Sequence, residues 1–427
     1  MITTRPTRAA LRVAAVSMAA AVALAGCGRE EDSGASPDVA PSEVTEGLAE
    51  GTITVWAMGA EGEQLDQIAA DFEAENPDAT VEVTPVPWDA AHDKIATAMA
   101  AGDTPDVSLV GTTWMGEFAR TDALDPTPTD LIDASAFFEG PWSTTVVDET
   151  SYGVPWYTET RVLYYRTDLA EQAGITEPPS DWEGLKELAQ GVQEAGAEWG
   201  IYLHPGGTGS WQTFMPFAWQ NGVELVDGDA FTLDSPEFVE ALEFYNSFYT
   251  DGLSPTEADP AIEQSFVTDK VGAFFSGPWH MSLIDEAGGP EFAGKWTVAP
   301  MPEQESRTSF VGGGDLVVFK DAENRDGGWK FVEYVTRPDV QQKFYGIVGA
   351  LPTNSEAWES GELADDPMLA TFGEQLQDAQ SPPTIPTWEE VASVIDGEIE
   401  KLVKAGLSAE EAAAAIQSGA ESIGTGS

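Results

Sequence analysis

Cysteine, histidine and basic side chains are scarce in this sequence. Its 427 residues include one Cys, three His and 19 Lys or Arg. A single cysteine excludes an internal disulfide, so the stability of the folded part must come from the burial of apolar side chains. The histidines are far apart and have no cysteine neighbours, so the spacing of a zinc site is absent. The chain also has no Gly-rich phosphate loop between a strand and a helix, and we expect no cofactor and no metal.

Acidic residues dominate the charge, because 74 Asp and Glu give a formal net charge of −55. A surface of this sign repels nucleic acid and anionic membrane surfaces, so neither is expected as a partner. Two explanations for the charge remain open. The protein works in a saline habitat, where the screening length falls to about 3 Å near 1 M salt, or it is an acidic exported protein that its charge keeps soluble.

The N-terminus has the pattern of an export leader. Three arginines precede the apolar run Val13–Ala25, which predicts a secretory signal peptide over residues 1–26. The run is too short to span a membrane, which takes about 20 apolar residues. Leu24-Ala25-Gly26-Cys27 resembles a bacterial lipobox, so Cys27 is expected to carry lipid and to anchor the protein to the outer face of the cell membrane, in the cell envelope. The alternative is an ordinary secreted protein with a stray thiol.

Composition changes after the leader. Residues 27–50 hold the lipidated cysteine and a segment rich in Ser, Pro, Ala and acids, which predicts a disordered tether. From Gly51 onward, apolar residues recur with strand and helix periods. The first part predicts strands at 53–57, 81–86 and 107–110 and helices at 65–72 and 90–101. This alternation predicts right-handed crossovers and a mostly parallel sheet.

The later chain alternates less regularly. It predicts helices at 238–249, 329–335, 391–402 and 407–416 and a strand at 271–275. Removal of 26 leader residues from 427 leaves 401. A chain of this length exceeds what one hydrophobic core usually serves, which indicates two lobes.

Aromatic residues follow several of the predicted strands. In an open α/β sheet, ligands bind beyond the carboxyl ends of the strands. The segments expected there, or beside similar apolar runs, are 56–61, Trp88, 111–114, 155–161 and 277–280. The chain has 14 Trp, and flat aromatic faces beside carboxylate, guanidinium and hydroxyl groups suit a pyranose, which offers apolar C–H faces and hydroxyls.

Four motifs, in this order along the chain, connect the sequence to a known family. The longest is Tyr152–Leu169, and it is followed by Phe275–Trp279, Gly312–Gly314 and Thr384–Trp388. With them the whole body, 51–423, resembles the sugar-binding lipoproteins of bacterial ABC importers, the group that includes maltose- and trehalose-binding proteins. The lipobox fits this resemblance independently.

The resemblance implies a two-lobed α/β fold of the periplasmic-binding-protein kind, in which each lobe is a mostly parallel sheet flanked by helices. Three hinge crossings are then expected near 153–155, 310–314 and 351–364, and the glycines 312–314 serve the hinge. The N-terminal lobe is expected over 51–154 with about 315–360, and the C-terminal lobe over 155–314 with about 361–427.

In such proteins the sugar binds between the lobes, where Tyr157 and Glu159 would hydrogen-bond its hydroxyls and Trp279 would stack on a ring. Relatives often place an acid shortly before the Trp of the third-strand loop. Gly111-Thr112-Thr113 stands here instead, which predicts a different hydroxyl pattern on that side. The expected ligand-binding residues are Glu61, Trp88, Thr112, Thr113, Trp114, Trp156, Tyr157, Glu159, Arg161, Trp211, Trp279, Gly313, Asp315 and Trp388.

Several of these residues have a structural alternative. Glu159 and Arg161 could form only a surface ion pair, worth under about 1 kcal/mol. Trp114 could simply begin a helix over Phe118. Four residues stay outside the set: Trp56 and Trp219 are expected in the core, His280 is expected to be structural, and the role of His204 stays open.

The predicted function is capture of an oligosaccharide, a di- or trisaccharide such as an α-glucoside, and its delivery to the permease subunits of an ABC importer. The protein is expected to be a monomer and not an enzyme. One alternative is a secreted glycosidase that uses two carboxylates, although 74 acidic residues make any pair of carboxylates uninformative. Another is a cell-surface lectin with no transporter.

Overall fold

The structure, a computed structural model, describes residues 43–426. The predicted leader, the predicted lipidation site Cys27 and most of the predicted tether lie outside the described residues. Among the described residues, no helix is long and apolar enough to cross a membrane.

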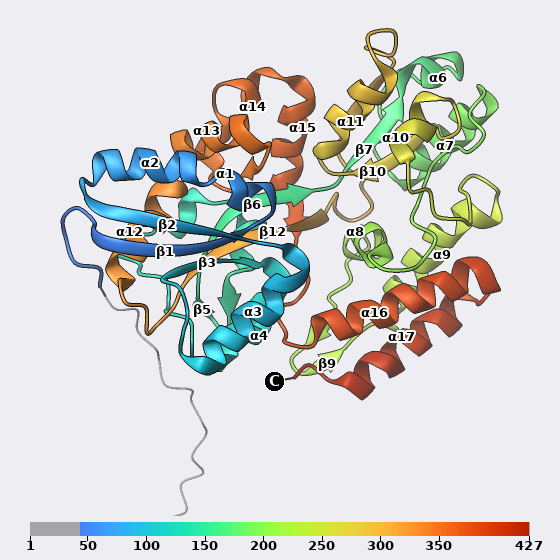
Figure 1. The fold of residues 1–427 in the computed structure, drawn as a ribbon. Coiled ribbons are helices and arrows are strands. Elements are labelled where there is room, and N and C mark those ends of the chain that lie inside the picture. Colours follow the sequence, from blue (N-terminus) through green and yellow to red (C-terminus); the bar gives the residue numbers. More distant parts are fainter. Residues whose placement is uncertain (1–42, 427) are drawn as a thin grey trace, which may run out of the picture. The chain divides into compact units, whose positions relative to one another are not determined.

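The first described elements alternate between strand and helix, as the sequence predicts. They are β1 (Glu50–Met58), α1 (Gly59–Gln64), α2 (Asp66–Glu75), β2 (Asp78–Val86), α3 (Trp88–Ala101) and β3 (Val107–Gly111). β1 pairs in parallel with both β2 and β3. Ile53, Val55 and Ala57, which alternate along β1, are fully buried. The predicted parallel arrangement is therefore confirmed for these three strands (Figure 1).

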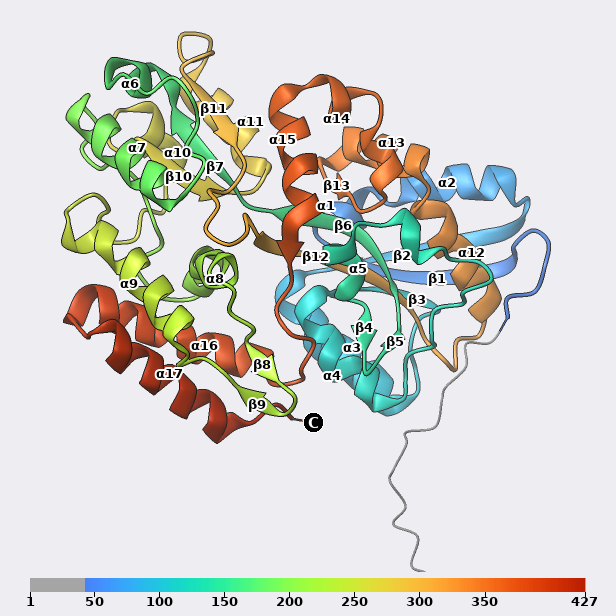
Figure 2. The ribbon, with the colours of Figure 1, turned by 180° about the vertical axis from the view of Figure 1, so that it is seen from behind.

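Strands from later in the chain extend this sheet beyond β3. Its order is β13-β6-β12-β3-β1-β2, and β14 (Ala379–Gln380) pairs with β12. β12 (Ser309–Val318) runs antiparallel to β3 and to β6 (Val154–Thr160), and β13 (Leu351–Pro352) runs antiparallel to β6. Strands from four distant parts of the chain thus lie side by side (Figure 2).

A second sheet of three strands has the order β10-β7-β11. Both β10 (Ala273–Ser276) and β11 (Trp296–Ala299) run antiparallel to the central β7 (Val162–Arg166). The mixed α/β fold class is confirmed, but the expectation of a mostly parallel sheet is wrong for this sheet. Crossover rules constrain successive strands, whereas about a quarter of the chain separates β7 from β10 and contains several helices.

The change from the first sheet to the second falls at Arg161, between the end of β6 and the start of β7. The sequence placed the first crossing earlier, near 153–155. A proline inside a strand usually marks an edge or an end. β6 nevertheless continues through Pro155, because the register of β6 against β12 shifts there, beside Gly314 and Asp315. A bulge of this kind accommodates a proline within a strand.

Helices fill the rest of the fold. α9 (Pro236–Thr250), α12 (Arg325–Val335), α16 (Trp388–Glu400) and α17 (Ala409–Ile423) confirm the predicted helices, and α16 continues as a π-helix, η6 (Lys401–Ala405). α16 and α17 pack beside α8 (Ser210–Gln220) and α9 (Figures 1 and 2). The other α-helices are α4 (Met115–Phe118), α5 (Glu139–Ser143), α6 (Thr167–Gln172), α7 (Trp182–Glu194), α10 (Ile262–Val267), α11 (Trp279–Gly288), α13 (Pro338–Val348), α14 (Glu362–Asp365) and α15 (Pro367–Gln375). Two short hairpins, β4 (Val146–Val147) with β5 (Thr150–Ser151) and β8 (Val226–Asp227) with β9 (Ala230–Phe231), complete the strands.

Three main clusters of buried apolar side chains make up the core. One lies among β1, β3, α2 and α12 and contains Trp329. The largest lies among α7, α8, α9, α16 and α17. The third packs around the three-stranded sheet and reaches α15. The first cluster shares no residue with the other two, although Phe310 of β12 belongs to the largest cluster and Leu351 of β13 to the third.

Candidate binding site

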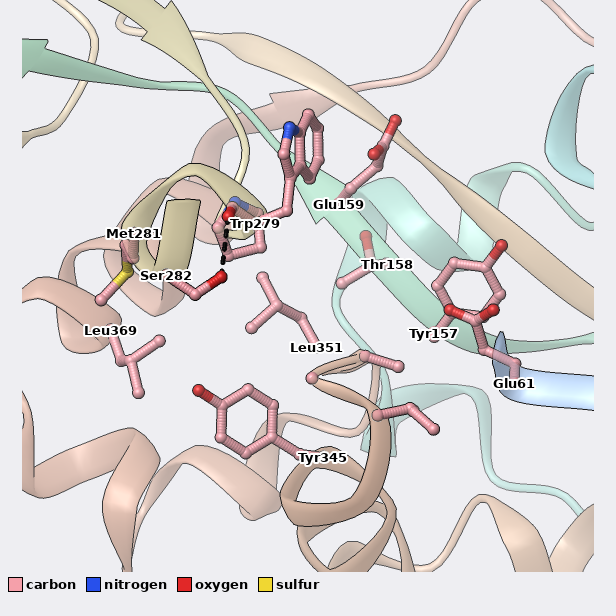
Figure 3. Close-up of a pocket in the computed structure, with 14 residues that line it drawn as sticks. Glu61, Tyr157, Thr158, Glu159, Trp279, Met281, Ser282, Tyr345, Leu351 and Leu369 are labelled. Atoms are coloured by element: carbon pink, nitrogen blue, oxygen red, sulfur yellow. Dashed lines mark hydrogen bonds between the residues drawn. The ribbon is translucent and has the colours of Figure 1, made fainter. Parts of the chain in front are cut away.

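Two neighbouring pockets share one tryptophan, Trp279 at the start of α11. The first pocket has a cavity volume of about 390 Å³ and is lined by Glu61, Tyr157, Glu159 and Trp279, among others (Figure 3). The second pocket, of about 290 Å³, is lined by Arg161, His204, Gln212, Trp279 and His280, among others. Volumes of this order are near the lower end of the range typical of small-molecule sites.

The strand β6 supplies the polar floor of the first pocket. Trp156, Thr158 and Thr160 are buried, whereas Tyr157 and Glu159 between them are partly exposed, as expected for side chains that alternate across a sheet. Thr158 Oγ1 donates to the Gly312 carbonyl at 3.2 Å, which ties β6 to β12. This alternation places Tyr157 and Glu159 in the pocket and directs Trp156 away from it.

Trp279 is held in place although its side chain is 40% exposed. A Cβ on Gly277 would lie 2.0 Å from a ring carbon of Trp279, so the indole packs directly on the glycine backbone. The Arg161 guanidinium lies over the indole ring, 4.7 Å from its centroid. The ring thus lines both pockets with little freedom to turn.

Arg161 is a buried cation with one unsatisfied nitrogen. Its side chain is 12% exposed, and Nη2 donates to Gln212 Oε1 at 3.1 Å and to Glu159 Oε1 at 3.4 Å. Nη1 is buried and has no hydrogen-bond partner among the described residues. Such a donor is costly unless something satisfies it. Arg161 and Glu159 therefore do form an ion pair, but both residues also line the two pockets.

Burial controls the protonation of the acidic groups here. It raises the pKa of Glu61, and the nearby Glu159 carboxylate raises it further. Burial, with the charges of Glu61 and Glu159, also raises the pKa of Tyr157 well above its ordinary value. Tyr157 is therefore a neutral phenol that can both donate and accept.

Asp315 lies behind the pocket in β12, fully buried. Burial raises its pKa to about 8. Thr144 Oγ1 lies 3.0 Å from both Asp315 carboxyl oxygens and 2.7 Å from the Pro141 carbonyl. One hydroxyl proton cannot serve both, so a protonated Asp315 that donates to Thr144, which donates to Pro141, satisfies all three groups. The prediction that Asp315 contacts the ligand directly is wrong, because its side chain is fully buried in the protein.

Three of the predicted tryptophans are also enclosed by protein. Trp156 is 2% exposed and stacks on Phe344 with ring centroids 4.8 Å apart. Trp388 is 1% exposed, and Trp211 packs edge-on against it at 5.3 Å. None of the three lines either pocket. The prediction of direct ligand contact is wrong for them in this structure, because helices from distant parts of the chain cover their rings.

The residues after β2 and β3 form a separate aromatic group. Trp88, 37% exposed, packs edge-on against Trp114 at 5.6 Å. Trp114 also contacts Phe118, with centroids 6.2 Å apart, as its structural alternative predicts. Thr112 and Thr113 are partly exposed in a short 3-10 turn. These residues line neither pocket.

Gly313 belongs to the backbone of the site. It has a φ of 132°, and a Cβ there would lie 2.2 Å from the Tyr157 carbonyl oxygen. Only glycine allows β6 and β12 to approach so closely at this point. Gly313 lines neither pocket.

The sequence reasoning missed part of both pockets. Tyr345, Leu351 and Leu369 line the first pocket, and Gln212 and Tyr202 line the second. Tyr345 and Leu369 lie on helices whose apolar residues look like ordinary core positions. Gln212 directly follows Trp211, which was itself a predicted site residue. Its position there is the one sequence signal that indicates a pocket residue among those missed.

His204, whose role the sequence left open, and His280, which was expected to be structural, both line the second pocket. Burial lowers the pKa of His204, so its ring is neutral, and its buried Nδ1 has no hydrogen-bond partner among the described residues. His280 Nδ1 lies 2.6 Å from Ser276 Oγ, and burial lowers its pKa to about 4. Among residues 43–426, no group of three or more His, Cys, Asp or Glu side chains could hold a metal ion.

The chain is similar to known binding proteins over most of its length. The family model described as bacterial extracellular solute-binding protein matches residues 57–342. A putative binding protein of Brucella abortus (strain 2308) is 29% identical over 351 residues, covering 80% of this chain and 85% of that protein. The diacetylchitobiose binding protein DasA of Streptomyces coelicolor is 27% identical over 401 residues, covering 89% and 90%.

Solved structures agree with these sequence relatives. The sugar-binding protein MalE from Xanthomonas citri is 32% identical, covers 87% of this chain and 97% of its own, and superposes with a TM-score of 0.83. The GacH receptor of Streptomyces glaucescens, solved unliganded and with acarbose, is 27% identical, with coverages of 88% and 98% and a TM-score of 0.73.

Proposed function

The chain belongs to the bacterial extracellular solute-binding proteins, and from this premise we propose that it captures an oligosaccharide for delivery to the permease of an ABC importer. One observation carries the choice of a sugar: a preorganised, 40% exposed indole lies beside two carboxylates and a neutral phenol in one pocket. An indole offers a flat face to the C–H face of a pyranose, and the oxygen atoms around it suit hydroxyls.

We assign a role in sugar binding to five side chains of the two pockets. Glu61 and Glu159 accept hydrogen bonds from sugar hydroxyls, while Tyr157 donates or accepts. Trp279 stacks on a ring. Arg161, which lines the second pocket, donates to a ligand oxygen there. Two pockets that share one indole support a ligand of two or three rings, such as an α-glucoside.

The relatives support the sugar class by their names. One relative is a diacetylchitobiose binding protein, one is a maltotriose-binding protein, and one solved structure holds acarbose. These names differ in the sugar, so they support an oligosaccharide without selecting one. They offer no support for a glycosidase, and we propose binding without turnover.

We further propose two lobes, as expected from the sequence, one around the seven-stranded sheet and one around the three-stranded sheet with α8, α9, α16 and α17. The first cluster, which shares no residue with the other two, supports this division. The first boundary moves to Arg161, where the chain changes sheets, and the glycines 312–314 are proposed to serve the hinge. Export, lipid anchoring through Cys27 and a monomeric state complete the proposal.

A thermal-shift screen tests the proposed function. The mature protein is heated with maltose, trehalose, maltotriose and diacetylchitobiose, with mannitol as the control polyol. A ligand at a hundred times its dissociation constant adds about 2.7 kcal/mol to stability, so at least one sugar is expected to raise the melting temperature clearly. A melting temperature that no sugar changes contradicts the proposal.

A further inference from the structure

One side of the first pocket is apolar. Met281 of α11, Tyr345 and Val348 of α13, Leu351 of β13 and Leu369 of α15 line it, and we call these five residues the apolar wall. In Figure 3, Met281, Leu369, Leu351 and Tyr345 lie on the side away from Glu159, Tyr157 and Glu61. The pocket therefore has a polar half and a mainly apolar half, in which the hydroxyl of Tyr345 is polar.

The apolar wall is built in two layers. Leu351 and Leu369 are 1% and 3% exposed and form its back. Met281, Tyr345 and Val348 are only partly buried and present their surfaces to the cavity. The hydroxyl of Ser282, which also lines the pocket, already donates to the Trp279 carbonyl at 3.1 Å. Carboxylates line only the other half of the pocket.

An unsubstituted sugar matches the ring and hydroxyl of Tyr345, but it does not match the aliphatic part of the wall, which is Met281, Val348, Leu351 and Leu369. Hydroxyls project from most ring carbons of a pyranose, and a hydroxyl buried against aliphatic side chains loses its hydrogen bonds to water without replacement. A methyl or alkyl group placed there gains from its removal from water. The wall and Trp279 line the same pocket, so one ligand can contact both.

We infer that the ligand is a glycoside with an apolar substituent, whose sugar ring stacks on Trp279 while the substituent packs against Met281, Tyr345 and Val348. The inference rests on the proposed function and narrows its ligand class. The competing occupant of the wall is the protein itself, when its elements close on a bound sugar.

Calorimetric titration of matched ligands tests the inference. Glucose, maltose, cellobiose and diacetylchitobiose are each compared with their butyl glycosides on the mature protein. Burial of one methylene improves affinity about fourfold, so for the sugar that fits, the butyl glycoside is expected to bind at least tenfold more tightly than its parent.

Variants locate the effect. Met281→Gln keeps the length of the side chain but makes it polar, and it should reduce the butyl-to-parent affinity ratio to about threefold or less. Leu283→Gln on the same helix is the matched control, because Leu283 is 40% exposed and does not line the pocket. It should leave the ratio unchanged. If Met281→Gln does not fold, Val348→Thr tests the same wall with a side chain of the same shape.

The outcomes separate the inference from the proposed function. Parent sugars that bind as well as their butyl glycosides overturn the inference and leave sugar capture standing, with the wall covered by the protein. A butyl advantage that survives the wall variant that folds also overturns it. Absence of binding by every parent and every glycoside overturns both.

Discussion

Trp279 is the residue on which sugar capture depends most. A stacked ring that hides about 50 Å² of apolar surface contributes about 1.3 kcal/mol, close to tenfold in affinity. Trp279→Ala is therefore expected to weaken sugar binding at least tenfold, while unfolding of the free protein changes by less than about 1 kcal/mol, because the side chain is 40% exposed. Calorimetric titration and thermal unfolding of one variant measure both quantities.

Trp388 provides the matched control for that prediction. Its side chain is 1% exposed, so Trp388→Ala should cost about 3–5 kcal/mol of stability. If Trp279→Ala instead destabilises the fold by a similar amount and the folded variant binds sugar normally, Trp279 is a packing residue and the account of the site is wrong.

Gly277 acts through Trp279. Because a Cβ there would lie 2.0 Å from the indole, Gly277→Ala must turn or shift the ring, and sugar affinity is expected to fall about tenfold or more. Gly397→Ala is the control, since no atom lies within 4 Å of its Cβ position in α16. That change should stabilise the protein by up to about 1 kcal/mol. Equal affinities for the two variants in calorimetric titration contradict the positioning role.

At the scale of single residues, the structure brings part of the expected site together, and the contact of these residues with a ligand stays a prediction. Glu61, Tyr157, Glu159, Arg161 and Trp279 all line one or both pockets. Exposure could not be read from residue type. Trp156 is covered by Phe344, which comes from a helix far along the chain, and no local pattern contains that contact.

At the scale of an element, the buried Asp315 makes the stability of β12 depend on pH. Its ordinary pKa of 3.8 applies to the unfolded chain, whereas in the fold it is about 8. Between these values the unfolded state loses this proton and the folded state keeps it. The contribution of Asp315 to the free energy of unfolding is therefore full below pH 4, falls as pH rises and levels off above pH 8, a loss of several kcal/mol.

Asp315→Asn removes this titration and keeps a donor for Thr144. The stability of the variant relative to the native protein should therefore increase from pH 5 to pH 9, measured by chemical denaturation in high salt. The difference between the two proteins isolates Asp315 from the other carboxylates. Two stability curves that stay parallel across this range mean that Asp315 is ionised in the fold.

Helices and strands were predicted best where strand and helix periods alternate regularly along the sequence. The alternation of strands and helices through β3 gave both the elements and their parallel pairing. The antiparallel strands β12 and β13 return after long excursions, and their partners depend on contacts between distant segments. The bulge beside Pro155 likewise appears only when β6 meets β12.

At the scale of the whole molecule, the net charge of −55 predicts a dependence on salt. If the surface is adapted to salt, screening relieves repulsion in the compact state more than in the expanded chain, so the melting temperature at pH 7 should rise clearly between low salt and about 1 M sodium chloride. Near the isoelectric pH of about 4.1, the rise should disappear. A melting temperature at pH 7 that stays flat or falls with salt favours a merely acidic exported protein.

Anchoring is a second property of the whole molecule. Leu24-Ala25-Gly26-Cys27 predicts lipidation, and membrane attachment through acyl chains depends on the modified cysteine. The native protein is expected to partition into detergent with a modified Cys27, whereas Cys27→Ser should be released or left unprocessed. Unmodified native protein in the aqueous phase contradicts the lipobox.

The central claim, capture of an intact sugar, is tested most directly by one titration followed by recovery of the ligand. The mature protein is titrated calorimetrically with a panel of di- and trisaccharides, and the sugar is then released by denaturation and weighed by mass spectrometry. The account predicts saturation at one sugar per chain and recovery of the ligand with its mass unchanged. Absence of binding by every sugar of the panel, or recovery of shorter sugars, contradicts it.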